Sequence, residues 1–240
     1  MTVVQLADDL LRVLAPNPGP MTLDGTNTYV VGGGELLVVD PGPAGDGHHD
    51  RVLAAVAGRP VTAVVLTHMH PDHSEGAWTL ADSLGVPVLR AADGSLTSGQ
   101  QLADGLLVLA TPGHTADSVC LVGADRVFTG DTVLGRGTTV VAHPDGALGP
   151  YLASLHALQA LGERQVLPGH GPPLDDLAAV ASAYLAHRHE RLAQVRDAGA
   201  AGATTVEEIV QRVYADVDRS LWPAAALSVA AQMEWLQEHG

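Results

Sequence analysis

The chain has 240 residues, enough for one large domain with a small appended one, and 46% hydrophobic against 16% charged residues is a globular composition. The formal net charge is −15, from 12 basic and 27 acidic residues, which argues against a protein that binds nucleic acid through a basic surface. A single cysteine excludes a disulfide framework.

The N-terminal segment, MTVVQLADDLLRVL, has two aspartates inside its apolar run. It therefore lacks the basic start and the uninterrupted apolar stretch of a secretory signal. No other stretch is apolar for long enough to span a membrane. The sequence predicts a cytoplasmic protein without a membrane partner.

Short apolar runs that end abruptly at Gly, Pro, His or Asp recur through the first three quarters of the chain. Runs of this kind, rich in Leu and β-branched residues, are typical of buried strands. They span residues 35–43, 61–70, 105–114, 125–132 and 164–171. Helical patterns at 50–57, 75–84 and 151–161 lie between them. We therefore expect layered sheets covered by helices, with polar residues at the ends of strands.

The pattern changes after Pro173. Residues 175–196 predict one long helix rich in Ala and Leu, and the segment GAAGAT at 199–204 is typical of a hinge or linker. Thr205 and Glu208 then form a capping-box pattern, and a last amphipathic helix is predicted from about residue 223 to 238. The expected organisation is a domain over residues 1–173 and a helical region over 174–240.

The segment THMHPDH, from Thr67 to His73, follows an apolar run and so lies on the loop that leaves a buried strand. On such a loop His68 and His70 can reach one metal ion, while Asp72 and His73 can point toward a second. Imidazole and carboxylate together suit zinc, manganese or iron, and neutral imidazoles favour zinc at a hydrolytic site.

Three further polar residues end other apolar runs in the same way: His114 in TPGHT, Asp131 in FTGDT and His170 in LPGHG. A glycine beside each of them lets the backbone turn tightly and approach a metal closely. The sequence therefore predicts a two-metal centre. Its predicted ligands are His68, His70, Asp72, His73, His114, Asp131 and His170.

These residues resemble the metallo-β-lactamase superfamily, whose HxHxDH motif matches residues 68–73. The resemblance implies an α+β fold, a four-layer αββα sandwich with a dizinc site at one edge. It assigns the first metal to His68, His70 and His114. It assigns the second metal to Asp72, His73 and His170. Asp131 is implied to bind both.

The segments at 17–32, 133–140, 168–172 and 186–192 are similar to the β-lactamase-like protein 2 family. That resemblance implies a small winged-helix domain after the sandwich, which fits the helices expected after Thr205. The sequence ends at EWLQEHG, where a winged helix would continue into its β-wing. We therefore expect a winged-helix-like domain without its wing.

Two divalent ions in such a centre can share a water and present it as a bridging hydroxide, and Asp72 is predicted to orient this nucleophile and move its proton. Cys120 lies in an apolar run and is predicted to be a buried packing thiol. The commonest zinc β-lactamases have cysteine where this chain has Asp131, and the resembling di-iron oxidases have an acidic residue where it has His70. True β-lactamase and redox activities are therefore disfavoured.

Three residues are candidates for substrate binding, each with a structural alternative. Asn27 can bond substrate or satisfy its own turn, and Thr138 can line the cleft or begin a strand. Arg188 can contact an anionic substrate group or lie on a solvated helix face. Trp78 and Trp222 are predicted to belong to the core rather than to a recognition surface.

The resemblance implies an endoribonuclease that cleaves single-stranded RNA. The acidic charge and the 3% aromatic content argue against it, because such proteins stack bases on aromatic rings. The alternative is a thioesterase or lactonase acting on a small acyl substrate. A non-catalytic interaction protein is disfavoured because all seven ligands are present. The segment from Asp175 onward contains ten acidic residues and only five arginines, so DNA is not an expected partner. The oligomeric state stays open.

Overall fold

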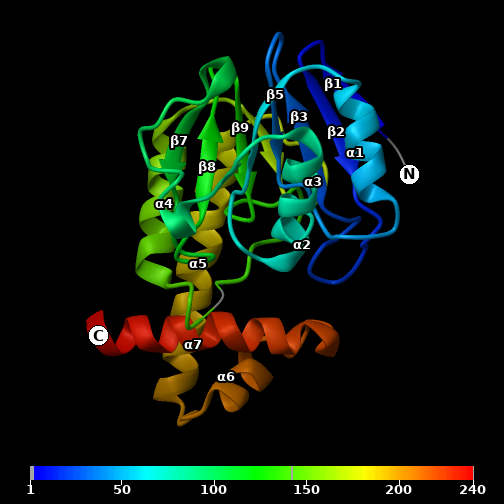
Figure 1. The fold of residues 1–240 in the computed structure, drawn as a ribbon. Helices are drawn as coiled ribbons and strands as arrows, with labels where there is room; N and C mark the ends of the chain where they lie inside the picture. The colour runs from blue at the N-terminus through cyan, green and yellow to red at the C-terminus, as the bar shows by residue number, and fades with distance from the viewer. Residues whose placement is uncertain (1–2, 142, 240) are drawn as a thin grey trace.

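Two β-sheets lie face to face between helices in the structure, a computed structural model that describes residues 3–141 and 143–239 (Figure 1). The first sheet has its six strands in chain order: β1 (Val3–Ala7), β2 (Leu10–Leu14), β3 (Asn27–Val31), β4 (Leu36–Val39), β5 (Val61–Val65) and β6 (Val88–Leu89). The second has the order β10 (Gln165–Pro168), β9 (Arg126–Gly130), β8 (Val119–Val122) and β7 (Leu107–Ala110).

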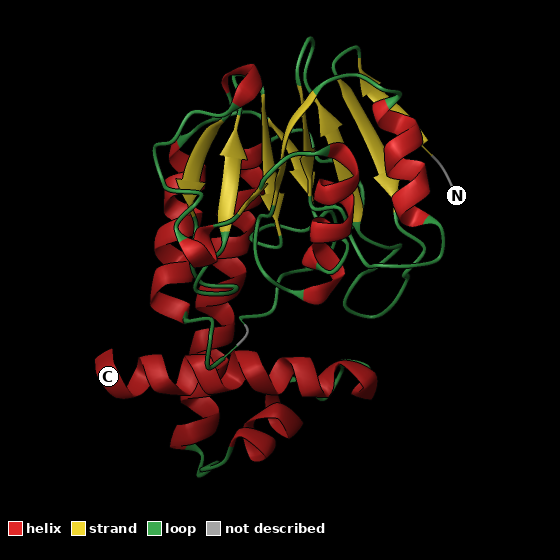
Figure 2. Cartoon of the chain, viewed as in Figure 1, coloured by secondary structure: helices red, strands yellow, loops and turns green. Residues whose placement is uncertain are grey.

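Helices cover the outer faces of both sheets (Figure 2). On the first sheet these are α1 (His48–Val56) and α3 (Ala77–Leu84); on the second they are α4 (Leu148–Ala160) and α5 (Leu177–Ala200). Shorter turns of helix are α2 (Pro71–Ser74), η1 (Ala91–Asp93), η2 (Ala103–Gly105) and η3 (Arg219–Leu221). The predicted α+β, four-layer αββα sandwich is confirmed. No helix among the described residues is long and apolar enough to cross a lipid bilayer.

The strands are apolar on both faces because each face packs against another layer. In β4, Leu37 and Val39 face the second sheet, while Leu36 and Val38 face α1 and α3. A strand covered on both sides needs no polar alternation, so its sequence is a continuous apolar run. This explains why period-two patterns are absent from the runs that became strands.

The long helix α5 belongs to two parts of the molecule. Its first half packs through Ala181 and Leu185 on the second sheet, and its second half packs through Val195 against α6 (Val206–Val213) and α7 (Trp222–His239). Figure 1 shows α7 crossing α5 beyond the ends of the sheets. We call the second half of α5 together with α6, η3 and α7 the helical cap. Residues 177–239 contain helices and turns and no strand.

Several boundaries differ from the sequence prediction. The expected hinge or linker at 199–204 is shorter than predicted, because α5 continues through Ala200 and residues 201–204 form the turn that leads to α6. Ala203 in this turn is buried, and its backbone N–H donates to the Ala198 carbonyl oxygen at 3.0 Å. The expected helix at 75–84 is confirmed as α3, which begins two residues later than predicted, and α2 is a separate turn of helix before it. Trp78 is 43% exposed, with the Arg90 guanidinium 5.0 Å from its ring centre, so its assignment to the core is also wrong. The capping box of Thr205 is confirmed.

Candidate metal centre

Loops at one edge of the sandwich bring the predicted ligands together. Strands β7, β9 and β10 run in the same direction, so the turns that follow them, which carry His114, Asp131 and His170, meet at one edge. The loop after β5 of the first sheet carries residues 68–73 to the same place. Three groups of potential ligand atoms, each with its atoms within 4.8 Å of one another, include all seven predicted side chains.

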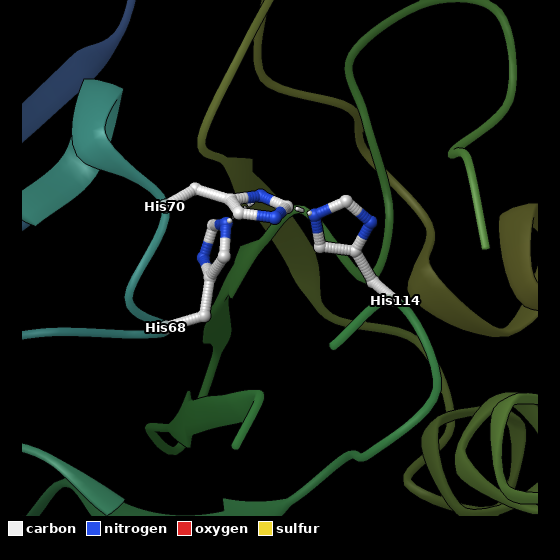
Figure 3. A group of neighbouring side chains, drawn as sticks. All are labelled: His68, His70 and His114. Atoms are coloured by element: carbon white, nitrogen blue, oxygen red, sulfur yellow. Dashed lines mark hydrogen bonds between the residues drawn. The ribbon is translucent and has the colours of Figure 1, made fainter. Parts of the chain in front are cut away.

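One group consists of three histidines whose ring nitrogens face one another (Figure 3). His70 Nδ1 lies 3.0 Å from His68 Nε2 and 3.0 Å from His114 Nε2. Two nitrogens bound to one tetrahedral zinc at about 2.0–2.1 Å are about 3.3 Å apart. The three rings are therefore spaced as ligands of a single ion.

A second group lies beside it. His73 Nε2 is 3.1 Å from His170 Nε2, and Asp72 Oδ2 is 3.1 Å from His170 Nε2 and 3.7 Å from His73 Nε2. His73 and His170 are fully buried, whereas the Asp72 side chain is 28% exposed. This group combines two buried imidazoles with one carboxylate that meets solvent.

Asp131 lies between the two groups. Its Oδ1 is 3.4 Å from His73 Nε2 and 3.5 Å from His170 Nε2, and its Oδ2 is 3.7 Å from His114 Nε2. Oδ1 is buried and has no hydrogen-bond donor among the described residues. A buried carboxylate oxygen without a donor is unfavourable unless a cation compensates it. The donor set therefore fits two divalent cations with Asp131 between them.

In three of the predicted ligand histidines, the ring nitrogen that points away from the centre lies within hydrogen-bond distance of an oxygen. His73 Nδ1 lies 2.9 Å from Asp40 Oδ2, His114 Nδ1 lies 2.6 Å from the Val140 carbonyl oxygen, and His170 Nδ1 lies 3.2 Å from the Gly25 carbonyl oxygen. Such partners fix the tautomer and the orientation of a metal-binding imidazole. These rings are thus held in place by the protein itself.

Asp40 is a supporting residue that the sequence analysis missed. It ends β4 in a left-handed conformation with φ of 48°, is 2% exposed, and accepts hydrogen bonds from the Thr67 backbone at 2.8 Å and the Thr67 hydroxyl at 2.7 Å. The same hydroxyl lies 3.1 Å from His68 Nδ1. Asp40 therefore supports His68 and His73, one from each group. In the sequence, Asp40 lies at the end of the apolar stretch in residues 35–43, which is the apolar run before the one that leads into THMHPDH.

A buried polar chain holds the backbone of Asp40 in turn. The Thr28 hydroxyl donates to the Asp40 carbonyl oxygen at 2.7 Å and lies 2.8 Å from His48 Nε2. Burial, and then the nearby Arg51, lower the pKa of His48 to about 4, so its ring is neutral at pH 7. His48 is therefore a buried structural histidine and not one of the seven predicted metal ligands.

The electrostatics of the site follow from burial and from its carboxylates. Burial, reinforced by the neighbouring His73, lowers the pKa of His68 well below its ordinary 6.5 and keeps the ring available as a neutral ligand. At His73 burial acts in the same direction, but the carboxylates of Asp131 and Asp40 outweigh it and raise the pKa. The centre therefore favours positive charge.

The predicted substrate residues lie in different surroundings. Asn27 is fully buried, and its side-chain amide donates to the carbonyl oxygens of Pro168 at 2.9 Å and Gly171 at 2.8 Å. It fastens the loop that carries His170, a role that differs from both alternatives given by the sequence, a substrate contact and a bond within its own turn. Thr138 and Arg188 instead both line a pocket beside the metal-binding residues.

This pocket has a volume of about 290 Å³ and lies between the site and the helical cap. His114 and Asp131 form part of its wall. Its apolar lining comes from two loops and from the cap: Met21, Leu23, Leu134, Val217, Leu221 and Ala225. Sequence reasoning did not anticipate it, because its walls come from distant segments. An apolar chain in this pocket would have one end at the metal-binding residues.

Cys120 lies behind the site rather than in it. The thiol is fully buried, with Sγ 3.3 Å from the Thr111 hydroxyl, and burial raises its pKa to about 11. Its prediction as a packing residue is confirmed.

Residues 21–100 match the family profile described as metallo-beta-lactamase superfamily, and residues 205–240 match that described as beta-lactamase associated winged helix domain. A beta-lactamase-like protein 2 homolog from Caenorhabditis elegans is 31% identical over 99% of this chain and 87% of its own length. An atrochrysone carboxyl ACP thioesterase from Aspergillus fumigatus is 34% identical over 87% of this chain and 74% of its own length.

The fold also matches solved structures. A metallo-beta-lactamase family protein from Thermus thermophilus has a TM-score of 0.81 with 21% identity, covering 98% of this chain and 95% of that one. At this identity the likeness concerns the fold. The coverage includes the cap as well as the sandwich, so the two parts are arranged similarly in both chains.

Proposed function

The chain belongs to the metallo-β-lactamase superfamily and is a hydrolase of that fold, and we propose that its substrate is a small acyl thioester or a related ester. The donor set fits two divalent cations, and we propose zinc for both positions, with manganese or iron as substitutes. When bound, two such cations supply a hydroxide nucleophile near neutral pH and neutralise the charge that develops on the substrate oxygen.

The observation that supports this substrate class is the pocket beside the site. Its lining is mostly apolar, its volume is about 290 Å³, and it adjoins His114 and Asp131. A pocket of this kind suits an acyl chain whose carbonyl group lies at the metal-binding residues. The A. fumigatus relative, named as a carboxyl ACP thioesterase, supports the same class.

Single-stranded RNA, the substrate that the family resemblance implies, fits this geometry less well. Binding a strand needs an extended basic groove with several exposed aromatic rings. The pocket has one aromatic side chain, Tyr214, and the Arg191 guanidinium lies 4.8 Å from the centre of its ring. The protein as a whole carries a formal charge of −15.

The remaining roles in hydrolysis are assigned to side chains of the protein itself. We assign to Asp72, the partly exposed carboxylate of the site, the role of orienting the attacking water and accepting its proton. Asp131, buried between the two ligand groups, sets their separation. The apolar wall of the pocket excludes water from the acyl chain and positions its carbonyl carbon.

The test is direct. Zinc-loaded protein is incubated with acyl thioesters of increasing chain length and, separately, with end-labelled single-stranded RNA. We expect the wild type to hydrolyse the thioesters. In His68→Ala the rate of hydrolysis should fall by at least about a hundredfold, because a metal ligand is removed. His156→Ala, an exposed histidine on α4, is the matched control and should retain full activity. RNA cleavage with inert thioesters would replace this proposal by the ribonuclease hypothesis.

A further inference from the structure

The pocket is more basic than an acyl-chain pocket needs to be. Three arginines line it: Arg136, Arg188 and Arg191. Arg136 is neutralised, because its two terminal nitrogens donate to Asp24 at 2.7 and 2.9 Å. The other two arginines have no carboxylate partner among the described residues.

Arg188 is the one buried arginine in the described part of the chain, at 3% exposure. Its Nη2 donates to the Thr139 carbonyl oxygen, and its Cζ lies 5.2 Å from the centre of the Tyr151 ring. Its Nε is buried and has no hydrogen-bond partner among those residues. A buried guanidinium with an unused donor and no counter-ion is unfavourable by itself.

Arg191 follows three residues later on α5, so the two side chains leave the same side of the helix. Its Nη1 donates to Gln194 Oε1 at 2.9 Å and to the Val213 carbonyl oxygen at 3.0 Å. These bonds, together with the Tyr214 ring, hold the guanidinium in place and leave its other nitrogens uncommitted. Arg191 is therefore oriented before any ligand arrives.

The other charged residues around the pocket do not neutralise Arg188 and Arg191. Asp131 is the one acidic residue in its lining, and it already faces three histidines of the metal centre. The pKa of the neighbouring His187 is lowered, first by burial and then by Arg188 and Arg191. Although the chain has 27 acidic residues, neither Arg188 nor Arg191 is paired with a carboxylate in the part of the chain that the structure describes.

We propose that Arg188 and Arg191 form an anion subsite that binds a carboxylate on the acyl part of the substrate, so that the enzyme prefers carboxylated acyl chains to plain ones. This inference rests on the proposed function, because it names a feature of the acyl group in the same pocket. The guanidinium fork matches a carboxylate with two parallel hydrogen bonds, and the low dielectric of a buried site strengthens them.

The same arginines could meet an anion from the leaving group, such as the phosphate of a pantetheine carrier. The lining favours the acyl side, since both arginines lie in the wall of the small pocket that adjoins His114 and Asp131. Uncharged leaving groups separate the two sources. Glutaryl and pentanoyl thioesters of N-acetylcysteamine share a five-carbon chain and differ by one carboxylate.

The experiment compares these two thioesters, and pentanoyl-coenzyme A, in the zinc-loaded wild type and in Arg191→Gln. We expect the KM for the glutaryl thioester to rise about tenfold in the variant, with kcat and both pentanoyl substrates within twofold. Arg191→Lys should recover part of the loss. Arg196→Gln, which removes an exposed charge from the same helix, is the matched control and should change nothing.

Two results would overturn the inference. Equal losses on glutaryl and pentanoyl thioesters would give Arg191 a structural role. A loss confined to pentanoyl-coenzyme A would assign the arginines to a leaving-group phosphate. Circular dichroism checks that each variant folds.

Binding of glutarate and pentanoate, measured by calorimetry on the same proteins, needs no turnover and so separates this inference from the proposed function. Tighter binding of glutarate that is lost in Arg191→Gln supports the subsite even if no thioester is hydrolysed. Equal affinities of the wild type for both acids would overturn it.

Discussion

The metal centre and the helical cap form opposite walls of one pocket and are built differently. In the centre every predicted ligand histidine other than His70 has a neighbour within hydrogen-bond distance of its second ring nitrogen. The backbone is also closely packed there, because a Cβ added at Gly169 would lie 2.6 Å from His73 Cε1 and 2.7 Å from Asp131 Oδ1. The cap contributes apolar side chains and two arginines with uncommitted donors. Under the proposed function, the centre carries out the hydrolysis and the cap selects the substrate.

The strongest test of this division removes Asp131, the residue between the two ligand groups. Asp131→Ala should lower activity on the order of 10³-fold and also lower bound metal, because several kcal/mol of charge stabilisation depend on the cations it helps to hold. Metal content is measured by atomic emission. Asp125→Ala, at the other end of β9, should leave both quantities unchanged. A metal-free Asp131→Ala protein with full activity would contradict the mechanism.

A smaller effect is expected from the support of the ligands. Asp40→Asn keeps the shape of the side chain and tolerates the left-handed backbone, but removes the charge next to His73. Metal affinity should fall about 10–100-fold, as measured by competition with a chelator. Asp46→Asn is matched, because Asp46 has a similar φ of 49° and is exposed. Equal affinities in the two variants would remove Asp40 from the site.

Changes in the cap should alter substrate choice and not metal content. Ala224 lines the pocket, so Ala224→Phe should raise the KM for longer acyl thioesters about tenfold while acetyl thioesters change less than threefold. Leu227→Phe, 40% exposed on the same helix, is the control. A uniform fall in kcat with loss of metal would mean that the cap supports the centre as well.

The smallest effect concerns the stability of the cap. Thr205 and Glu208 form a reciprocal capping box at the start of α6. Thr205→Ala should lower the melting temperature by about 2–4 °C without changing metal content. Thr79→Ala, an exposed position on α3, controls for the loss of a hydroxyl. Calorimetry checks the shift, and a loss of metal in Thr205→Ala would show that the two regions are coupled.

Local patterns predicted much of the sandwich. The apolar runs at 61–70 and 164–171 became β5 and β10 because burial on both faces leaves a continuous apolar sequence. Strands β1 to β3 were not predicted, since each is a short segment that mixes polar with apolar residues and so carries a weaker signal. The predicted hinge or linker begins two residues later than expected, because Gly199 and Ala200 are also compatible with a helix end, and only the tertiary structure shows that Ala203 is packed.

The sequence by itself determined which side chains meet at the candidate metal centre, because each ends an apolar run beside a glycine or within one short loop. Only the tertiary structure showed that Asp40 supports this centre, since that depends on β4 lying beside β5. It also decided that Asn27 holds a loop and that Arg188 lines a pocket. Partners of this kind come from segments far apart in the chain, and no local period or spacing records which segments pack together.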